Sequence, residues 1–328
     1  MKISIAMCTY NGAEFLSAQL ESILDQTRLP DEIVICDDRS TDNTQNLLKK
    51  FATESPVPIT LHINDHNLGS VKNFERTISL CTGDVIALSD QDDVWRSDKL
   101  ALFETVLNNS PSAGIVFSDA AIVDENLRPL NRRMWDEVGF DTHKRKLLKS
   151  GRALEVLITG WTVTGATMAF RSRFVKLSLP IPEEIAMIHD GWIALTIAAV
   201  ADVVAIDEPL IQYRQHAQQQ IGAPIRKDAG PERRGLQAID TAFRRRNSSA
   251  DLHKILETLA ARLLAQASEF ETRKALSFVS DYARHLNVRA NLPQRRLNRV
   301  PRILRELLSL RYHEYANGFK SAAKDLVS

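Results

Sequence analysis

Short apolar runs alternate with amphipathic stretches over the first part of the chain. Each run ends at turn-forming or acidic residues, which is typical of buried strands. The runs cover residues 3–8, 32–36, 59–63 and 85–88, and a fifth begins at 115. Between them, apolar side chains recur at helical spacing over 14–26, over a stretch that follows the turn at 37–42 and ends at 51, and over 71–80 and 98–107. This alternation predicts an α/β fold with a mostly parallel sheet flanked by helices.

The pattern changes twice farther along the chain. From residue 118 to about 224 it is mixed: we expect a strand over 162–170, a helix over 190–200, and a strand over 203–213 that Pro209 interrupts. After 224, a loop rich in proline, glycine and charge leads into sequence with helical spacing, which Pro301 is expected to split. The sequence therefore predicts a Rossmann-like domain over 1–224 and a basic C-terminal helical region over 225–328.

The formal net charge of the 328 residues is +1, but it is unevenly distributed. Residues 226–328 contain 21 lysines and arginines against 11 aspartates and glutamates, so the first 225 residues carry excess negative charge. Two halves of opposite charge usually have different partners.

Nothing in the sequence predicts secretion or membrane insertion. The three cysteines lack CxxC spacing and indicate free thiols in a reducing compartment. The apolar start is too short for a signal peptide, and the longest uncharged stretch, 156–170, is too short to span a bilayer. We expect a cytoplasmic protein, or one that lies peripherally on the cytosolic face of the inner membrane.

The strongest candidate for chemistry is Ser-Asp-Gln-Asp-Asp-Val-Trp at 89–95, directly after the fourth predicted strand. In open α/β sheets, ligands bind beyond the carboxyl ends of the strands. Asp90 and Asp92 are two residues apart and can converge on one ligand, and Asp93 is a further carboxylate. Such oxygen donors suit Mg²⁺ or Mn²⁺, which also bind substrate phosphates. The alternative is a solvated acidic turn, or a helix cap.

Polar residues follow the other predicted strands as well. They are Thr9-Tyr10-Asn11-Gly12 after the first strand, Asp37-Asp38 after the second, and Asn67-Leu68-Gly69 with nearby Lys72 after the third. Amides, backbone N–H groups and a lysine suit a pyrophosphate, and carboxylates suit ribose hydroxyls. Each cluster alone is an ordinary turn. Several at one rim of a sheet indicate a shared ligand crevice.

These motifs, in this order, resemble family 2 glycosyltransferases with the GT-A fold, and in particular bacterial rhamnosyltransferase-like members. The resemblance covers roughly residues 1–222. It rests on Cys-Thr-Tyr-Asn-Gly at 8–12, Ile-Cys-Asp-Asp-Arg-Ser-Thr-Asp-Asn-Thr at 35–44, Asn-Leu-Gly at 67–69 and the heptapeptide at 89–95.

The resemblance implies a nucleotide-sugar site and a metal site. The metal would be Mg²⁺ or Mn²⁺, bound by Asp92 or Asp93, with His216 as an additional ligand. The nucleotide-sugar residues would be Thr9, Tyr10, Asn11, Asp37, Asp38, Asn67, Lys72, Asp90 and Arg214.

The resemblance also implies a catalytic base and an acceptor side. Asp190 matches the acidic motif that supplies the base of inverting enzymes, although a carboxylate at a helix start is usually a cap. Trp192 would offer an apolar platform for a sugar. Trp161 would form part of the acceptor wall, although its glycine-rich surroundings also suit close strand packing.

The basic C-terminal helix offers a separate surface. Its arginines interleave with apolar residues over 295–311, a pattern typical of helices that lie on anionic membranes. The alternative is a helix packed on a domain or partner, with the arginines in solvent. No base-reading module is visible, so we do not expect nucleic-acid binding.

The sequence thus predicts an inverting, metal-dependent transfer of a sugar from a dTDP- or UDP-sugar to a hydroxyl of a glycan or lipid-linked acceptor in cell-surface polysaccharide synthesis. The resemblance makes rhamnose the first donor sugar to test. The alternatives are a nucleotidyltransferase of similar fold and a non-catalytic protein that binds sugar nucleotides.

Overall fold

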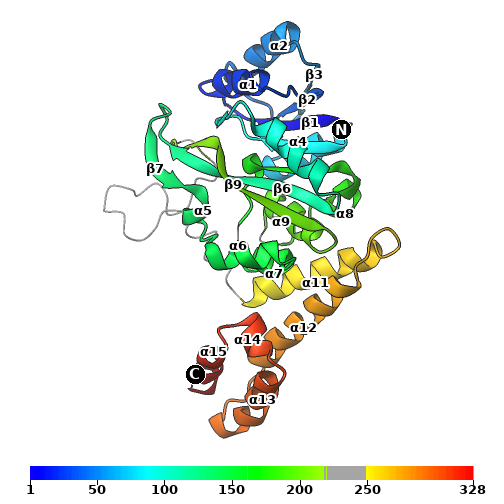
Figure 1. Cartoon of the computed structure of the whole chain (residues 1–328), viewed down its shortest axis with the longest axis vertical. Helices are drawn as coiled ribbons and strands as arrows, with labels where there is room; N and C mark the ends of the chain where they lie inside the picture. The colour runs from blue at the N-terminus through cyan, green and yellow to red at the C-terminus, as the bar shows by residue number, and fades with distance from the viewer. Residues whose placement is uncertain (161, 186, 218, 220–248, 328) are drawn as a thin grey trace. The chain divides into compact units, whose positions relative to one another are not determined.

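A computed structural model describes residues 1–160, 162–185, 187–217, 219 and 249–327 (Figure 1). The chain forms two compact units. The first comprises the described residues of Met1–Ile181 and Met187–Thr241, and the second those of Pro182–Ala186 and Ala242–Ser328. The predicted boundary between 224 and 225 lies outside the described residues.

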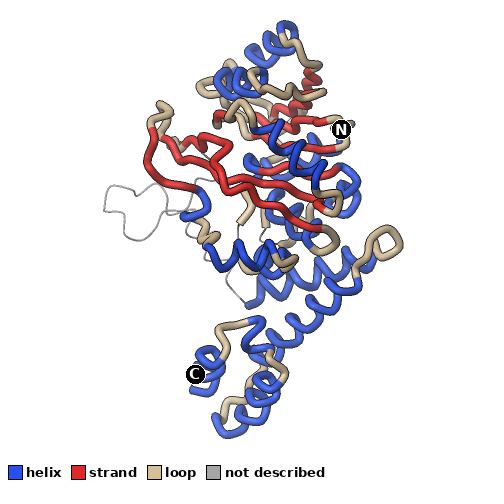
Figure 2. The backbone as a smooth tube through the Cα atoms, in the orientation of Figure 1, coloured by secondary structure: helices blue, strands red, loops and turns tan. Residues whose placement is uncertain are grey.

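The first unit is built on one mixed sheet of nine described strands (Figure 2). Its strand order is β3-β2-β1-β4-β8-β6-β9-β5, with β7 paired to β6. β3, β2, β1 and β4 are mutually parallel, as the alternation of strands and helices predicts. β8 runs antiparallel between β4 and β6, and β9 is parallel to β6. The strands are β1 (Ile3–Thr9), β2 (Glu32–Asp37), β3 (Ile59–Ile63), β4 (Val85–Ser89), β5 (Val94–Trp95), β6 (Ala113–Val123), β7 (Pro129–Arg133), β8 (Met168–Arg171) and β9 (Asp202–Arg214).

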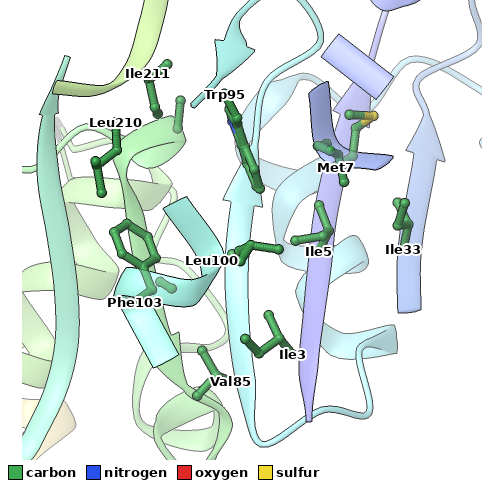
Figure 3. Packing of buried hydrophobic residues seen from close by; sticks show 14 of the residues in the cluster. Ile3, Ile5, Met7, Ile33, Val85, Trp95, Leu100, Phe103, Leu210 and Ile211 are labelled. Carbon is green, nitrogen blue, oxygen red and sulfur yellow. The ribbon is translucent and has the colours of Figure 1, made fainter. Parts of the chain in front are cut away.

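Helices cover both faces of this sheet. The side chains of α1, α2 and α4 share one hydrophobic core with alternate residues of β1. Figure 3 shows part of this core, with Ile3, Ile5 and Met7 of β1 and Leu100 and Phe103 of α4. On the other face, α3 packs against β1 and β2. The helices of this unit are α1 (Leu16–Leu24), α2 (Thr44–Glu54), α3 (Ser70–Leu80), α4 (Lys99–Asn109), α5 (Met134–Glu137), α6 (Thr142–Lys149), α7 (Ala153–Ile158), α8 (Val175–Ser178) and α9 (His189–Ala198), with 3-10 turns η1 (Gly165–Thr167) and η2 (Ser172–Phe174).

Two strand predictions in this unit need correction. Of the expected strand over 162–170, only residues 168–170 belong to a strand, β8, because the 3-10 turn η1 lies directly before it. Pro209 does not interrupt β9; it lies opposite Asp119 of β6, where the register between the two strands shifts, and such irregular positions tolerate proline.

The second unit is helical in its described residues, as the spacing of apolar residues predicts. Its helices are α11 (Ser249–Ala265), α12 (Arg273–Ala290), α13 (Arg296–Leu308), α14 (Arg311–Tyr315) and α15 (Phe319–Val327). Contrary to expectation, α13 runs through Pro301. Pro301 is the sixth residue of the helix, so it removes one backbone hydrogen bond, to the Leu297 carbonyl, without ending the helix. None of the described helices is long and apolar enough to cross a membrane.

Candidate active site

A cleft of about 670 Å³ lies at the carboxyl ends of β1, β2 and β4, where the sequence predicts the ligand crevice. The start of α9 and the residues after β9 complete its wall. Of the predicted site residues, it is lined by Thr9, Tyr10, Asn11, Asp38, Asp90, Asp92, Asp190 and His216. Residues separated by more than 200 positions in the chain therefore meet in one cavity of the first unit.

The loop after β1 is tied to the acidic heptapeptide by Gln91, which lies between the two cleft aspartates. The Tyr10 N–H donates to Gln91 Oε1 (2.8 Å), and Gln91 Nε2 donates to the Tyr10 carbonyl (3.0 Å). A Cβ on Gly12 would lie 2.2 Å from Gln91 Oε1, so this close approach requires glycine. The Tyr10 ring remains exposed at the cleft. The sequence did not point to Gln91.

Asp38 is held by the loop that follows β3. Its carboxylate accepts hydrogen bonds from the N–H groups of Leu68 (2.7 Å) and Gly69 (2.8 Å), and from Asn64 Nδ2 (2.8 Å). Asn67 lies outside the cleft lining, and its Nδ2 donates to the Asp38 carbonyl (3.3 Å). The loop thus fixes Asp38 rather than presenting Asn67 to the cavity.

Asp37 and Asn11 stabilise the neighbouring turns. Asp37 is buried and accepts hydrogen bonds from Thr9 Oγ1 (2.9 Å) and from Ser40. Asn11 has a positive φ of 47°, and its side chain accepts from the Thr41 N–H (2.8 Å). These bonds tie the end of β1 to the turn after β2.

The structure separates the roles of the three adjacent carboxylates. Asp92 lines the cleft, and its Oδ2 lies 2.8 Å from His216 Nε2. Asp93 points away into the interior, where Oδ1 accepts from the Arg214 N–H (3.1 Å) and Oδ2 has no hydrogen-bond partner among the described residues. Burial and the nearby Asp92 and Asp90 raise the pKa of Asp93 well above its usual range.

Asp90 is half-buried beside two other carboxylates. Burial, then the charges of Asp92 and Asp190, raise the pKa of Asp90 to about 7. The cleft therefore concentrates more negative charge than its own cations offset.

Arg214 and Lys72 do not line the cleft. Arg214 Nε donates to the Asp92 carbonyl (2.7 Å), and its guanidinium lies 4.6 Å from the centre of the Phe15 ring. Arg214 thus fixes the backbone that carries Asp92. Lys72 Nζ lies 3.4 Å from Glu75 on α3.

Lys99, at the start of α4, is a buried cation beneath the cleft that the sequence did not point to. Its side chain is 0% exposed, and Nζ donates to the Ala166 carbonyl (2.7 Å) and lies 3.4 Å from the centre of the Trp95 ring. Burial lowers the pKa of Lys99 well below its usual range, whereas the charges of Asp93 and Asp90 oppose that shift. The one sequence signal is its place on the apolar stripe that includes Phe103 and Leu107.

Asp190 lies in the first turn of α9 and faces the cleft. Its Oδ2 accepts from the Gly165 N–H (2.9 Å). The adjacent His189 stacks on Phe74 with ring centres 4.0 Å apart, and burial lowers the pKa of His189. The Asp190 carboxylate is therefore oriented from η1 beside a neutral imidazole.

The expectation for Trp192 is wrong. Its side chain is fully buried, and Nε1 donates to the Ser178 carbonyl (2.9 Å), so it offers no face to a sugar. The reason is that α9 is buried on all sides along this stretch. Trp161 lies outside the described residues.

Comparison with known proteins identifies relatives of the chain. The model of the family "Glycosyl transferase family 2" matches residues 4–177. The dTDP-rhamnosyl transferase RfbG of Shigella flexneri is 31% identical over 242 residues, which cover 70% of this chain and 78% of that protein. An uncharacterized glycosyltransferase of Nostoc sp. is 31% identical over 220 residues, which cover 66% of this chain. The match spans 65% of the Nostoc protein, slightly less than two thirds of its length.

Solved structures show the same fold. S. aureus TarS 1–349, crystallised in complex with UDP-GlcNAc, superposes with a TM-score of 0.56 at 15% identity, covering 99% of this chain and 91% of that one. The mixed sheet with its flanking helices is the GT-A architecture.

Proposed function

The chain belongs to glycosyl transferase family 2 and is a glycosyltransferase, and we propose that it transfers a sugar from a nucleoside-diphosphate sugar to an acceptor hydroxyl with inversion at the anomeric carbon. The observation that carries this proposal is the meeting of Asp190, Asp90, Asp92 and His216 in one cleft with Tyr10 and Asp38. A base, a cation site and a nucleotide site are the parts that such a transfer requires.

The nucleotide would lie along the ends of β1 and β2. The exposed Tyr10 ring can stack on a base, because aromatic side chains present a flat apolar face. Asp38 and Asp90 line the same cavity and can accept hydrogen bonds from ribose hydroxyls. The two hydrogen bonds between Gln91 and the Tyr10 backbone hold Tyr10 in place for this contact.

The residues present fit a divalent cation. Asp92 and His216 bring a carboxylate oxygen and an imidazole nitrogen to within 2.8 Å of each other, and His216 Nδ1 is buried without a hydrogen-bond partner among the described residues. A carboxylate oxygen suits Mg²⁺ or Mn²⁺, and an imidazole nitrogen is a ligand of transition-metal ions, which favours Mn²⁺ of the two.

Within the described ranges, no three His, Cys, Asp or Glu side chains are grouped to hold a metal. The remaining ligands would therefore be water and the diphosphate of the donor. When bound, such an ion would offset the negative charge that develops on the leaving diphosphate.

Asp190 is our candidate for the general base. In the proposed reaction, its carboxylate takes the proton of the acceptor hydroxyl while that oxygen forms a bond to the anomeric carbon. The bond from that carbon to the diphosphate breaks, and the nucleoside diphosphate leaves with the electron pair. The Gly165 N–H holds Oδ2 and the Gly191 N–H holds Oδ1 (2.5 Å), so both carboxylate oxygens are oriented, and each keeps a lone pair that can accept the proton of the acceptor hydroxyl.

The donor and the acceptor are proposed from the relatives. RfbG is named as a dTDP-rhamnosyl transferase, and so dTDP-rhamnose is the first donor to test, followed by UDP-sugars. We propose a hydroxyl of a glycan or lipid-linked glycan in cell-surface polysaccharide synthesis as the acceptor.

Asp190→Asn tests the proposed base. Asparagine keeps the size of the side chain and can still accept from the Gly165 N–H, although its amide nitrogen cannot accept from the Gly191 N–H, so donor binding should persist while kcat falls by about 100-fold or more. The matched control is Asp202→Asn, at an exposed position on β9, which should not change kcat. A near-normal kcat of the Asp190→Asn variant would exclude Asp190 as the general base. The anomeric configuration of the product, read by NMR, tests inversion directly.

A further inference from the structure

We propose that the outward face of α13 is a docking surface for anionic lipid membranes. The face belongs to the second compact unit and shares no residue with the cleft. The inference is therefore independent of the reaction proposed above.

The inner face of α13 accounts for the packing of this helix. Ile303 is buried in a small core with Tyr312 and Ala322. Glu306, also on this face, is buried and accepts hydrogen bonds from His285 Nδ1 (2.8 Å) and Arg311 (3.0 Å). The folding of the unit thus uses this face and leaves the opposite one in solvent.

The outer face carries an apolar row that this packing does not explain. Leu297, Pro301, Leu304 and Leu308 are spaced i, i+4, i+7 and i+11, which places them along one side of a helix; we call them the leucine stripe. Leu297 is 85% exposed, Leu304 51% and Leu308 84%. Single exposed leucines are common on protein surfaces, but an aligned row of them marks an interaction site.

Arginines border the leucine stripe on both sides. Arg296 precedes Leu297 and Arg305 follows Leu304, so each lies about 100° around the helix from the stripe, in opposite directions. Both arginines are exposed. The one acidic residue of α13, Glu306, is buried on the inner face, so all charged side chains on the outer face are basic.

This arrangement favours a lipid surface over a protein partner. An apolar row that enters the acyl boundary, with cationic side chains at the level of the phosphates, is the geometry of helices that lie in a membrane interface. Arginines on both sides complement anionic headgroups and are attracted to them. Leu310, two residues after α13, is also 63% exposed.

The experiment is co-sedimentation of the full chain with vesicles of phosphatidylcholine alone and of an equal mixture of phosphatidylcholine and phosphatidylglycerol. Leu304→Ser/Leu308→Ser should weaken binding to the mixed vesicles at least about tenfold, since each leucine contributes buried apolar area. Leu264→Ser is the matched control: Leu264 is 64% exposed but lies on α11, and its loss should leave binding unchanged. Circular dichroism checks that all variants keep the helical content of the wild type.

A second pair of variants tests the charges. Arg296→Gln/Arg305→Gln should abolish the preference for the anionic vesicles, and added salt should weaken wild-type binding in the same way. The proposal is overturned if the wild type does not sediment with the mixed vesicles, or if the leucine variant sediments as the wild type does. It is also overturned if the leucine stripe proves to hold two copies together, which analytical ultracentrifugation would show as a dimer that Leu304→Ser/Leu308→Ser converts to monomer.

Discussion

Replacing Lys99 with methionine removes a buried cation while nearly preserving the volume of the side chain. In the wild type, the Lys99 ammonium donates to the Ala166 carbonyl (2.7 Å) and lies 3.4 Å from the centre of the Trp95 ring. The methionine side chain has no N–H group to donate to the Ala166 carbonyl and no charge to place over the Trp95 ring. It also leaves the buried carboxylate of Asp93 without the positive charge that opposes its burial.

The cost in unfolding free energy follows from these contacts. A buried carbonyl left without a donor costs about 1–3 kcal/mol, and a desolvated cation–π contact contributes about 2 kcal/mol. Together the two contributions give a loss of about 3–5 kcal/mol, comparable with the loss found when one partner of a buried charge pair is removed. That is a large part of the about 5–15 kcal/mol that stabilises a typical domain.

Urea unfolding followed by tryptophan fluorescence measures this loss, with Lys50→Met on the exposed side of α2 as the control. Lys99→Met/Asp93→Asn should recover part of the stability, because it removes the carboxylate that the cation faces. If Lys99→Met costs less than about 1 kcal/mol, or if Asp93→Asn restores nothing, the idea that Lys99 offsets buried negative charge is refuted.

Three further substitutions test other parts of the structure. Gln91→Ala removes both bonds to the Tyr10 backbone and should raise the Kd of a nucleoside diphosphate about tenfold with little change in stability, as calorimetry would measure. Trp192→Phe leaves the buried Ser178 carbonyl without its donor and should lower the unfolding free energy by about 1–3 kcal/mol. The KM values of donor and acceptor should not change, and a large change in either would indicate that Trp192 contacts a substrate. Burial lowers the pKa of His285 below its ordinary 6.5, so the unfolded chain binds more protons and stability should fall as pH drops below 6.5. Thermal unfolding between pH 7.5 and 5 shows this fall, and His285→Gln, which cannot titrate but can still donate to Glu306, should flatten it.

The position of the cleft could be predicted from the sequence, because parallel strands bring their carboxyl ends to one rim. Thr9, Asp38 and Asp90 each follow an apolar run, and the run alone places them on that rim. The choice between Asp92 and Asp93 could not be made in this way. Adjacent side chains in a turn point in different directions, and only the backbone path decides that Asp92 enters the cleft and Asp93 the interior.

Other features depend on contacts between distant segments. The place of Lys99 on the apolar stripe of its helix indicates burial but not a partner, because its contact with Ala166 joins segments that are distant in the sequence. Trp192 is the opposite case, because the sequence alone indicates that its side chain is buried and does not face a sugar. The run Gly-Trp-Ile-Ala-Leu at 191–195 has no polar face, and a helix that is apolar all round is buried rather than presented to a ligand.

The cleft is held together by bonds between segments rather than within them, and this affects how its residues can be tested. Tyr10 depends on Gln91, Asp92 lies against His216, and Asp190 is oriented by the backbone of η1. Because η1 is in turn fastened by a side chain of α4, a substitution beneath the cleft can displace the proposed base without touching it. A lowered kcat alone therefore does not distinguish a residue that transfers a proton from one that positions its neighbour. The distinction requires variants such as Asp190→Asn, which change the chemistry of the group and retain the bond that orients it.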